Sequence, residues 1–210
     1  MKNYLDFKYK IDYEKLQEPA RIIKNGGIVV FPTETVYGIG TNGLDEKAIE
    51  RLYKVKKRLL NKPISLLVSD MEMVEKLTKD ITDMEYKLME TFFPGPLTII
   101  LKKKDIVPNI LTANTDTIGI RMPDAEIARK LIEYANVPIA APSANISGKP
   151  TGTNIESIIE DFEENVDFYI DDGESKLGIG STIVKVEDGI PKILREGSIS
   201  KEEIEKIIIK

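Results

Sequence analysis

The sequence contains no cysteine, no histidine and no tryptophan. Without cysteine, the chain can form no disulfide, no thiolate nucleophile and no cysteine metal site. Without histidine, it lacks the commonest general base, the commonest transition-metal ligand and every catalytic triad built on an imidazole. Catalysis would therefore rest on carboxylates, amines, guanidinium groups, hydroxyls, backbone groups or a bound ion. This favours reactions that mainly need positioning and charge stabilisation, such as phosphoryl and nucleotidyl transfer.

Long apolar runs and standard ligand motifs are missing as well. No apolar stretch is long enough to cross a bilayer, and the first residues alternate charges with aromatics instead of forming the apolar core of a signal peptide. We therefore expect a cytoplasmic protein. The phosphate-binding patterns GxxxxGK[ST] and GxGxxG are absent, as are the metal spacings HxxH and CxxC.

Positive charge is concentrated in one segment. The formal net charge is −5, but residues 51–69 hold six cations and no acid. These cations are Arg51, Lys54, Lys56, Lys57, Arg58 and Lys62. In an acidic protein such a cluster favours a small anionic ligand over a nucleic-acid backbone. A solvated, lysine-rich helix face is the alternative.

The 210 residues, 41% of them apolar, alternate short apolar runs with amphipathic segments. This pattern predicts one α/β domain whose twisted, mixed sheet is flanked by helices. Strands are expected at 28–31, 64–68, 97–101, 117–123, 137–142, 168–173, 181–186 and 191–197. Helices are expected at 13–25 and 46–57, from Thr82 toward Phe93, from Asp124 to Tyr134, from Thr153 to about Phe162, and from Ser200 to the end. Capping boxes are predicted at Thr82/Glu85, Thr153/Glu156 and Ser200/Glu203.

The most informative stretch is GGIVVFPTETVYGIG, residues 26–40, a buried strand that opens into a hydroxyl-rich loop. Other strand ends also finish in hydroxyls, amides or cations. Converging strand ends would form one cationic cavity suited to a nucleotide phosphate together with a small carboxylate. Taken singly, each of these residues also has a local explanation, such as a turn or a surface ion pair.

The motifs in order resemble those of the YrdC/Sua5 family of threonylcarbamoyl-AMP synthases. They are PTETVYG, the KxR triplet 56–58, PGPLT at 94–98, IGIRMP at 118–123, PSAN at 142–145 and GSTIV at 180–184. The resemblance covers about residues 15–197. It leaves 1–14 as an N-terminal extension and 198–210 as a C-terminal helix packed on the same domain. Leu59 stands where many relatives have proline, and the chain resembles the short, single-domain form.

The resemblance implies a YrdC/RibB-like sheet around a positively charged cavity and a reaction of L-threonine, bicarbonate or CO2, and ATP. The products would be threonylcarbamoyl-AMP and pyrophosphate, for the N6-threonylcarbamoyladenosine at position 37 of tRNAs that read ANN codons. Mg2+ would be held by the ATP phosphates, with no side-chain ligand identified. A tRNA threonylcarbamoyl transferase would receive the product, and weak RNA binding is possible.

The resemblance also assigns site residues. It implies a threonine pocket formed by Thr33, Tyr37, Arg121, Ala141 and Ser181. It implies ATP contacts from Lys56, Arg58, Thr117, Ser143, Asn145, Thr151 and Arg195, of which Lys56, Arg58, Ser143 and Asn145 form the catalytic KxR/SxN set. Glu34 is expected to orient the loop or a water, and loop 172–180 is expected to be mobile and to close over the substrates.

Two alternatives remain open at this point. One is a non-catalytic RNA-binding module of the same superfamily, although only 7% of residues are aromatic and could stack on bases. The other is the YciO-type branch, against which PGPLT and the intact PSAN loop argue.

Overall fold

The computed structural model describes residues 3–151 and 154–208. Its strands form one mixed sheet in the order β1-β8-β2-β3-β7-β4-β6-β5-β9-β10. The strands are β1 (Tyr4–Asp6), β2 (Val29–Phe31), β3 (Gly38–Asn42), β4 (Leu66–Leu67), β5 (Leu97–Lys102), β6 (Thr117–Arg121), β7 (Ile139–Ala140), β8 (Phe168–Asp171), β9 (Thr182–Glu187) and β10 (Ile190–Arg195). The expected mixed α/β sheet is therefore confirmed.

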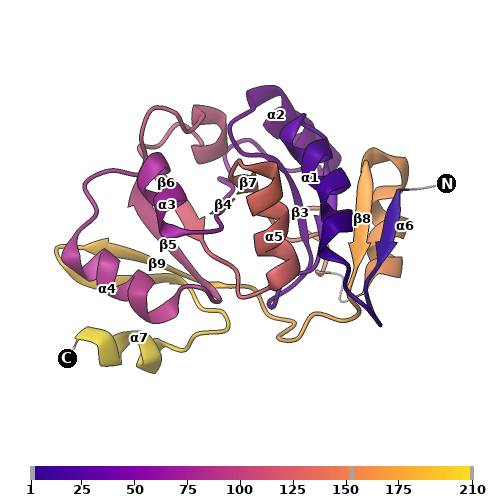
Figure 1. Ribbon diagram of the computed structural model, residues 1–210. Coiled ribbons are helices and arrows are strands. Elements are labelled where there is room, and N and C mark those ends of the chain that lie inside the picture. The colour runs from indigo at the N-terminus through magenta and orange to yellow at the C-terminus, as the bar shows by residue number, and fades with distance from the viewer. Residues whose placement is uncertain (1–2, 152–153, 209–210) are drawn as a thin grey trace.

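Helices cover both faces of the sheet (Figure 1). They are α1 (Gln17–Lys24), α2 (Glu46–Val55), α3 (Met71–Leu77), α4 (Asp83–Phe92), α5 (Glu126–Ala135), α6 (Ile155–Phe162) and α7 (Lys201–Ile208), with 3-10 turns at Tyr13–Leu16, Asn109–Thr112 and Glu163–Asn165. None of the helices in the described ranges is long and apolar enough to span a membrane.

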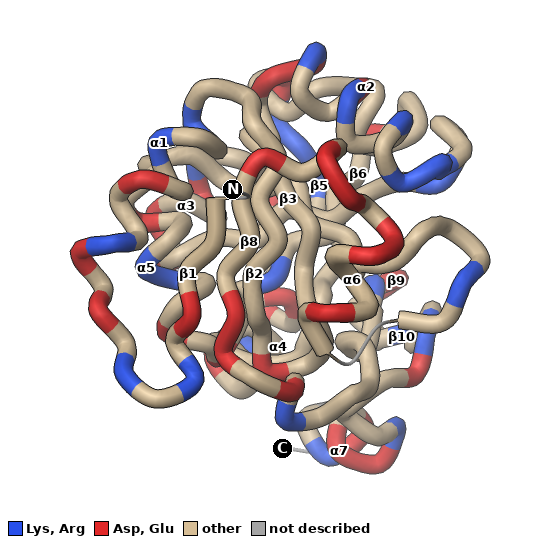
Figure 2. Tube along the Cα trace, turned by 90° about the vertical axis from the view of Figure 1, so that its right-hand side faces the viewer, with Lys and Arg blue, Asp and Glu red and all other residues tan. Residues whose placement is uncertain are grey.

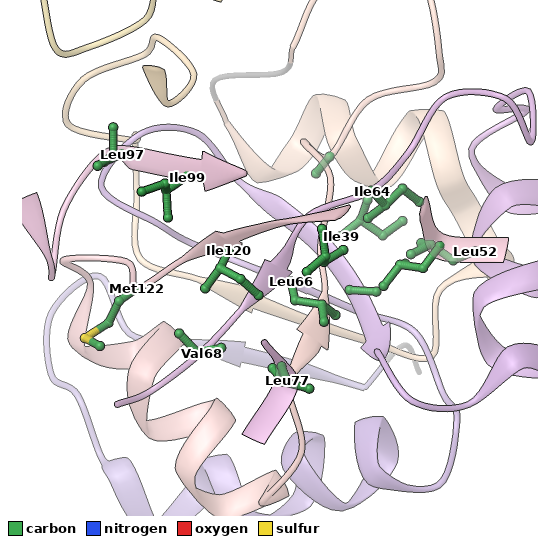
Figure 3. Close-up of a cluster of buried hydrophobic side chains, with 14 of the residues drawn as sticks. Ile39, Leu52, Ile64, Leu66, Val68, Leu77, Leu97, Ile99, Ile120 and Met122 are labelled. Carbon is green, nitrogen blue, oxygen red and sulfur yellow. The ribbon is translucent and has the colours of Figure 1, made fainter. Parts of the chain in front are cut away.

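Two apolar clusters lie on opposite faces of the sheet. Side chains from α1 and α5 pack with Val29 and Phe31, whereas the larger cluster receives Ile28 and Val30. Figure 3 shows part of the larger cluster, which contains strand residues such as Leu66 and Ile120 together with Leu52 of α2. Because successive strand residues point to opposite faces, β2 is apolar throughout: both of its faces are buried. In Figure 2 the charged residues lie mainly on helices and loops, and the middle of β2 and β3 carries none.

Two of the predicted helix starts are confirmed in detail. The Thr82 hydroxyl accepts from Glu85 N while the Glu85 carboxylate accepts from Thr82 N, and Ser200 and Glu203 form the same reciprocal pair. Each pair satisfies two backbone donors that the first turn leaves free.

Two other predicted starts, at Asp124 and Thr153, are not the N-caps that the structure describes. Asp124 does not cap α5: the N-cap is Ala125, and Asp124 lies 3.5 Å from Arg129 in an ion pair. The N-cap of α6 is Asn154, which accepts from Ser157 N, while Thr153 lies outside the described residues. The expected helix 13–25 is divided into a 3-10 turn and α1, with Pro19 in the first turn of α1, where it removes no helical hydrogen bond.

The N-terminal segment contributes to the sheet, which the sequence pattern did not indicate. Strand β1 pairs in parallel with β8, and Phe7 is buried in the smaller apolar cluster. The Asp171 carboxylate accepts a hydrogen bond from Tyr4 and pairs with Lys8 at 3.0 Å. These contacts attach the described part of residues 1–14 to the same sheet.

Candidate active site

A cavity of about 370 Å³ opens where several strands end or begin. Arg121 is the last residue of β6, Ala141 and Ser143 follow β7, Ser181 precedes β9, and Arg195 ends β10. The structure thus brings seven of the twelve predicted site residues to one cavity wall. They are Arg58, Arg121, Ala141, Ser143, Thr151, Ser181 and Arg195. Among the described residues, three arginines and one carboxylate, Glu196, line this space, a composition suited to an anionic ligand.

Arg121 forms an unusual buried pair with Glu34. Nη2 of Arg121 lies 2.8 Å from Oε1 of Glu34, and the two side chains are 9% and 8% exposed. Among the described residues, however, Nε and Nη2 of Arg121 and both carboxylate oxygens of Glu34 have no hydrogen-bond partner. The two groups therefore neutralise one another without satisfying one another's hydrogen bonds. Nε and Nη2 form one side edge of the guanidinium, the edge that binds a carboxylate bidentately.

Arg195 is held beside Ser181. Its Nη2 donates to the Ser181 carbonyl at 2.7 Å, and the Ser181 hydroxyl shares a 2.7 Å hydrogen bond with Thr98. Burial lowers the pKa of Arg195, and the nearby positive charge of Arg121 lowers it further. The arginine nonetheless stays a cation at any neutral pH, so two guanidinium groups face the same cavity.

Close backbone contact fixes this corner of the cavity. A Cβ at Gly197 would lie 2.2 Å from the Gly180 carbonyl oxygen, so only glycine fits there. The Thr182 hydroxyl accepts from Gly197 N and donates to the Ile199 carbonyl. Both sides of the turn after β10 are therefore fastened to the start of β9.

Lys56 lies beneath the loop that carries Ser143. Its side chain is 1% exposed, and its Nζ donates to the carbonyls of Ser143 and Asn145, both at 2.5 Å. Its own carbonyl accepts from Ser147 N at 2.9 Å. Burial, and to a lesser extent the charge of Arg58, lower the pKa of Lys56 to about 7. Lys56 thus fastens the loop to the end of α2 and does not line the cavity.

The Asn145 side chain completes this fastening. Its carbonyl oxygen accepts from the Ser143 hydroxyl at 2.6 Å, and its amide donates to the Lys149 carbonyl at 2.7 Å. Asn145 is 9% exposed and is not among the residues that line the cavity. In this arrangement the SxN pair is an internal loop contact, with Ser143 alone reaching the cavity.

A left-handed residue separates the two cations of the KxR triplet. Lys57 has φ 50°, and the Arg58 amide donates to the Tyr53 carbonyl at 2.9 Å, the geometry of a Schellman helix end. This turn sends Lys56 into the interior and Arg58 toward the cavity. The Arg58 guanidinium is positioned by the Lys62 and Pro63 carbonyls.

Most of the cations in 51–69 are not at the cavity. Arg51 pairs bidentately with Asp167, with its Nη1 at 2.5 Å and its Nη2 at 3.0 Å from the carboxylate oxygens. Lys54, Lys57 and Lys62 are exposed, so Arg58 alone of the six lines the cavity. The positive charge of the cavity wall comes instead from three segments far apart in the sequence.

Three further predicted residues lie away from the cavity. Thr33 is buried, donates to the Val36 carbonyl at 2.6 Å, and lines a second hollow of about 220 Å³. Tyr37 is fully buried and donates to the Gly173 carbonyl at 2.7 Å, and burial raises the pKa of its phenol. Thr117 begins β6, four residues before Arg121, on the same face by strand alternation.

Other cavity residues were not among those to which the resemblance assigned a role. Thr35, Ser65 and Thr98 contribute hydroxyl-bearing residues to the wall. Thr35 and Thr98 belong to the PTET and PGPLT motifs, so those motifs could have indicated them. Ser65 lies beside Gly119, where a Cβ would come within 2.5 Å of its hydroxyl, a contact between separate strands that no local pattern contains.

A family model described as "Telomere recombination", covering the Sua5, YciO and YrdC proteins, matches residues 21–197. The chain belongs to the Sua5/YciO/YrdC family. A Pyrococcus abyssi protein named threonylcarbamoyl-AMP synthase is 43% identical over 204 residues, which cover 97% of this chain and 60% of that protein. A Methanocaldococcus jannaschii protein named putative threonylcarbamoyl-AMP synthase is 41% identical over 203 residues, 95% of each chain.

The fold agrees with solved structures of the family. The crystal structure of P. abyssi Sua5 complexed with L-threonine superimposes with a TM-score of 0.94 at 42% identity, covering 98% of this chain and 60% of that one. The chain therefore spans about three fifths of the length of the Pyrococcus relative.

Proposed function

We propose that this chain is a nucleotidyltransferase that makes threonylcarbamoyl-AMP and pyrophosphate from L-threonine, bicarbonate or CO2, and ATP. The observation that carries the proposal is the cavity itself, whose wall contains Arg58, Arg121 and Arg195, with Nε and Nη2 of Arg121 making no hydrogen bond to the described residues. A carboxylate and a polyphosphate could be bound together there. The names of the Pyrococcus and Methanocaldococcus relatives support the same reaction.

At the threonine end, Arg121 would bind the substrate carboxylate through Nε and Nη2. Ser181 and the backbone at Ala141 line the same cavity and would contact the rest of the amino acid. Thr33 and Tyr37 lie behind the wall, where they fasten the loop that follows β2: Thr33 bonds to Val36, and the Tyr37 carbonyl accepts from Ala144 N. We assign them support of the pocket.

At the nucleotide end, Arg58, Ser143, Thr151 and Arg195 would contact ATP. Lys56 and Asn145 would act by holding Ser143 in place, and Thr117 stays a prediction because it does not line the cavity. No group of three or more carboxylates in residues 3–151 and 154–208 could bind a metal ion. We propose that Mg2+ enters as the ATP complex, bound to the phosphates.

The chemistry needs no histidine. The threonine amine and CO2 form a carbamate, whose anionic oxygen attacks the α-phosphorus of ATP as the bond to the pyrophosphate oxygen breaks. The protein contributes alignment and positive charge for the transferring phosphoryl group. The mixed anhydride would pass to a tRNA threonylcarbamoyl transferase for modification of adenosine 37 in tRNAs that read ANN codons.

The test is pyrophosphate release from ATP by the purified chain. We expect release only when L-threonine and bicarbonate are both present, and L-valine should not replace threonine, since the unpaired polar groups of the pocket would disfavour it. Release that is indifferent to threonine contradicts the proposal.

A further inference from the structure

Glu34 is the acid paired with Arg121, and its position relative to that arginine has a consequence for substrate affinity. The cavity wall includes Arg121 but not Glu34, whereas the second hollow is lined by Glu34 but not by Arg121. The pair therefore forms part of the partition between the two spaces. Glu34 contacts the guanidinium at Nη2, one of the two atoms that we propose bind the substrate carboxylate.

The ion pair places a negative charge beside Arg121 but does not orient the guanidinium through hydrogen bonds. Neither carboxylate oxygen of Glu34 makes a hydrogen bond within the described chain, although Oε1 lies 2.8 Å from Arg121 Nη2. A carboxylate that positioned the guanidinium would do so through directed hydrogen bonds. Removing the charge of Glu34 should therefore leave the direction of Arg121 largely unchanged.

We propose that Glu34 is an internal competitor that lowers the affinity of Arg121 for the substrate carboxylate. This inference rests on the proposed function, in which Arg121 binds the threonine carboxylate. When threonine binds, two carboxylates face one buried guanidinium, and the like charges repel at low dielectric. Glu34 thus sets the threonine affinity through its charge at Arg121.

The surroundings of Glu34 keep it at Arg121. The second hollow is acidic, with Lys176 as the sole cation among the described residues that line it. Its other ionisable residues are Asp124, Glu126, Asp172 and Glu174. The Glu34 carbonyl accepts from Leu177 N at 3.0 Å, which fixes the backbone. If the substrate displaced the Glu34 side chain, that side chain would move toward these other carboxylates. Their repulsion of Glu34 therefore opposes substrate binding.

The test is the Kd of L-threonine for Glu34→Gln, measured by calorimetry in the full chain. Glutamine keeps the size of the side chain and removes its charge. We expect threonine to bind on the order of threefold to tenfold more tightly, with the Kd of ATP unchanged. Glu34→Asp, which keeps the charge but shortens the reach, should give a smaller gain.

Glu174→Gln is the matched control, because it makes the same chemical change in the same hollow without contacting Arg121. Its threonine Kd should equal that of the wild type. An unchanged or weaker threonine Kd in Glu34→Gln, with a wild type that binds threonine, overturns the competitor role and leaves the proposed function standing. A wild type that does not bind threonine at all overturns both.

Discussion

The buried Lys56 gives the sharpest stability prediction. Lys56→Met keeps the length of the side chain but removes the Nζ that donates to the Ser143 and Asn145 carbonyls. Each lost hydrogen bond costs about 1 kcal/mol, and each carbonyl left buried without a partner adds about 1 kcal/mol or more. For the two hydrogen bonds and two carbonyls together, the free energy of unfolding should therefore fall by about 4 kcal/mol at pH 9.

The size of this loss should depend on pH. The pKa of Lys56 falls from 10.5 to about 7 on folding, so between these values the unfolded chain binds the extra proton and the folded chain does not. Stability contributed by this group therefore rises from pH 7 toward pH 10.5 and is lowest below pH 7, where the folded protein carries a buried charge. Methionine does not titrate, so the variant lacks this pH-dependent contribution to stability.

Urea unfolding of both proteins at pH 6 and pH 9 measures the difference. Each pKa unit corresponds to about 1.4 kcal/mol. The drop in the free energy of unfolding caused by Lys56→Met should therefore be smaller at pH 6 than at pH 9, by about 1–2 kcal/mol or more. Lys54→Met, at an exposed position on the same helix, should show no comparable pH dependence. If the loss of unfolding free energy in Lys56→Met is equal at both pH values, or larger at pH 6, burial does not lower the pKa of Lys56 on folding.

Three further results are expected. Arg121→Ala should weaken threonine binding on the order of thirtyfold or more while changing the ATP Kd little, and calorimetry that shows equal, mild losses for both ligands would disprove the pocket assignment. Gly197→Ala should lower the free energy of unfolding by about 2 kcal/mol or more, because its Cβ would lie 2.2 Å from the Gly180 oxygen, and an unchanged urea midpoint would argue against this close contact. Loop 172–180, which carries Gly178 and Gly180 of the cavity wall, should resist proteolysis when ATP and threonine are both present, and cleavage at the same rate with and without them would rule out its closure.

Local patterns were sufficient for much of the fold. The strand at 28–31 and the capping boxes at Thr82 and Ser200 depend on residues close in the sequence, and the structure has them where they were predicted. Strand β1 was missed because its three residues become a strand only by pairing with β8, more than 160 residues later. Pairing at that distance leaves no local periodicity.

The sequence allowed many residues of the candidate site to be predicted, but not how their side chains are arranged. The ordered motifs led to Arg58, Arg121, Ser143, Ser181 and Arg195, which the structure gathers at one cavity. Whether a residue faces that cavity or supports it depends on tertiary packing. Nothing near Lys56 in the sequence indicates that its amine caps two carbonyls about ninety residues away.

The pairing of Glu34 with Arg121 also depends on tertiary packing and not on the local sequence. In the sequence Glu34 is an acid in a hydroxyl-rich loop, with local roles to explain it. In the structure it is buried against a cation on a different strand and forms part of the partition between two hollows. Such a contact requires the order of strands in the sheet, which the sequence pattern did not provide.

The most direct test of the central claim is the product itself. The purified chain would be incubated with ATP, L-threonine and isotope-labelled bicarbonate, and the nucleotides would be analysed by mass spectrometry. We expect an adenylate that carries both threonine and the labelled carbon, and that disappears when threonine is omitted. An adenylate of threonine without the label, or ATP left unchanged in the complete mixture, would contradict this expectation.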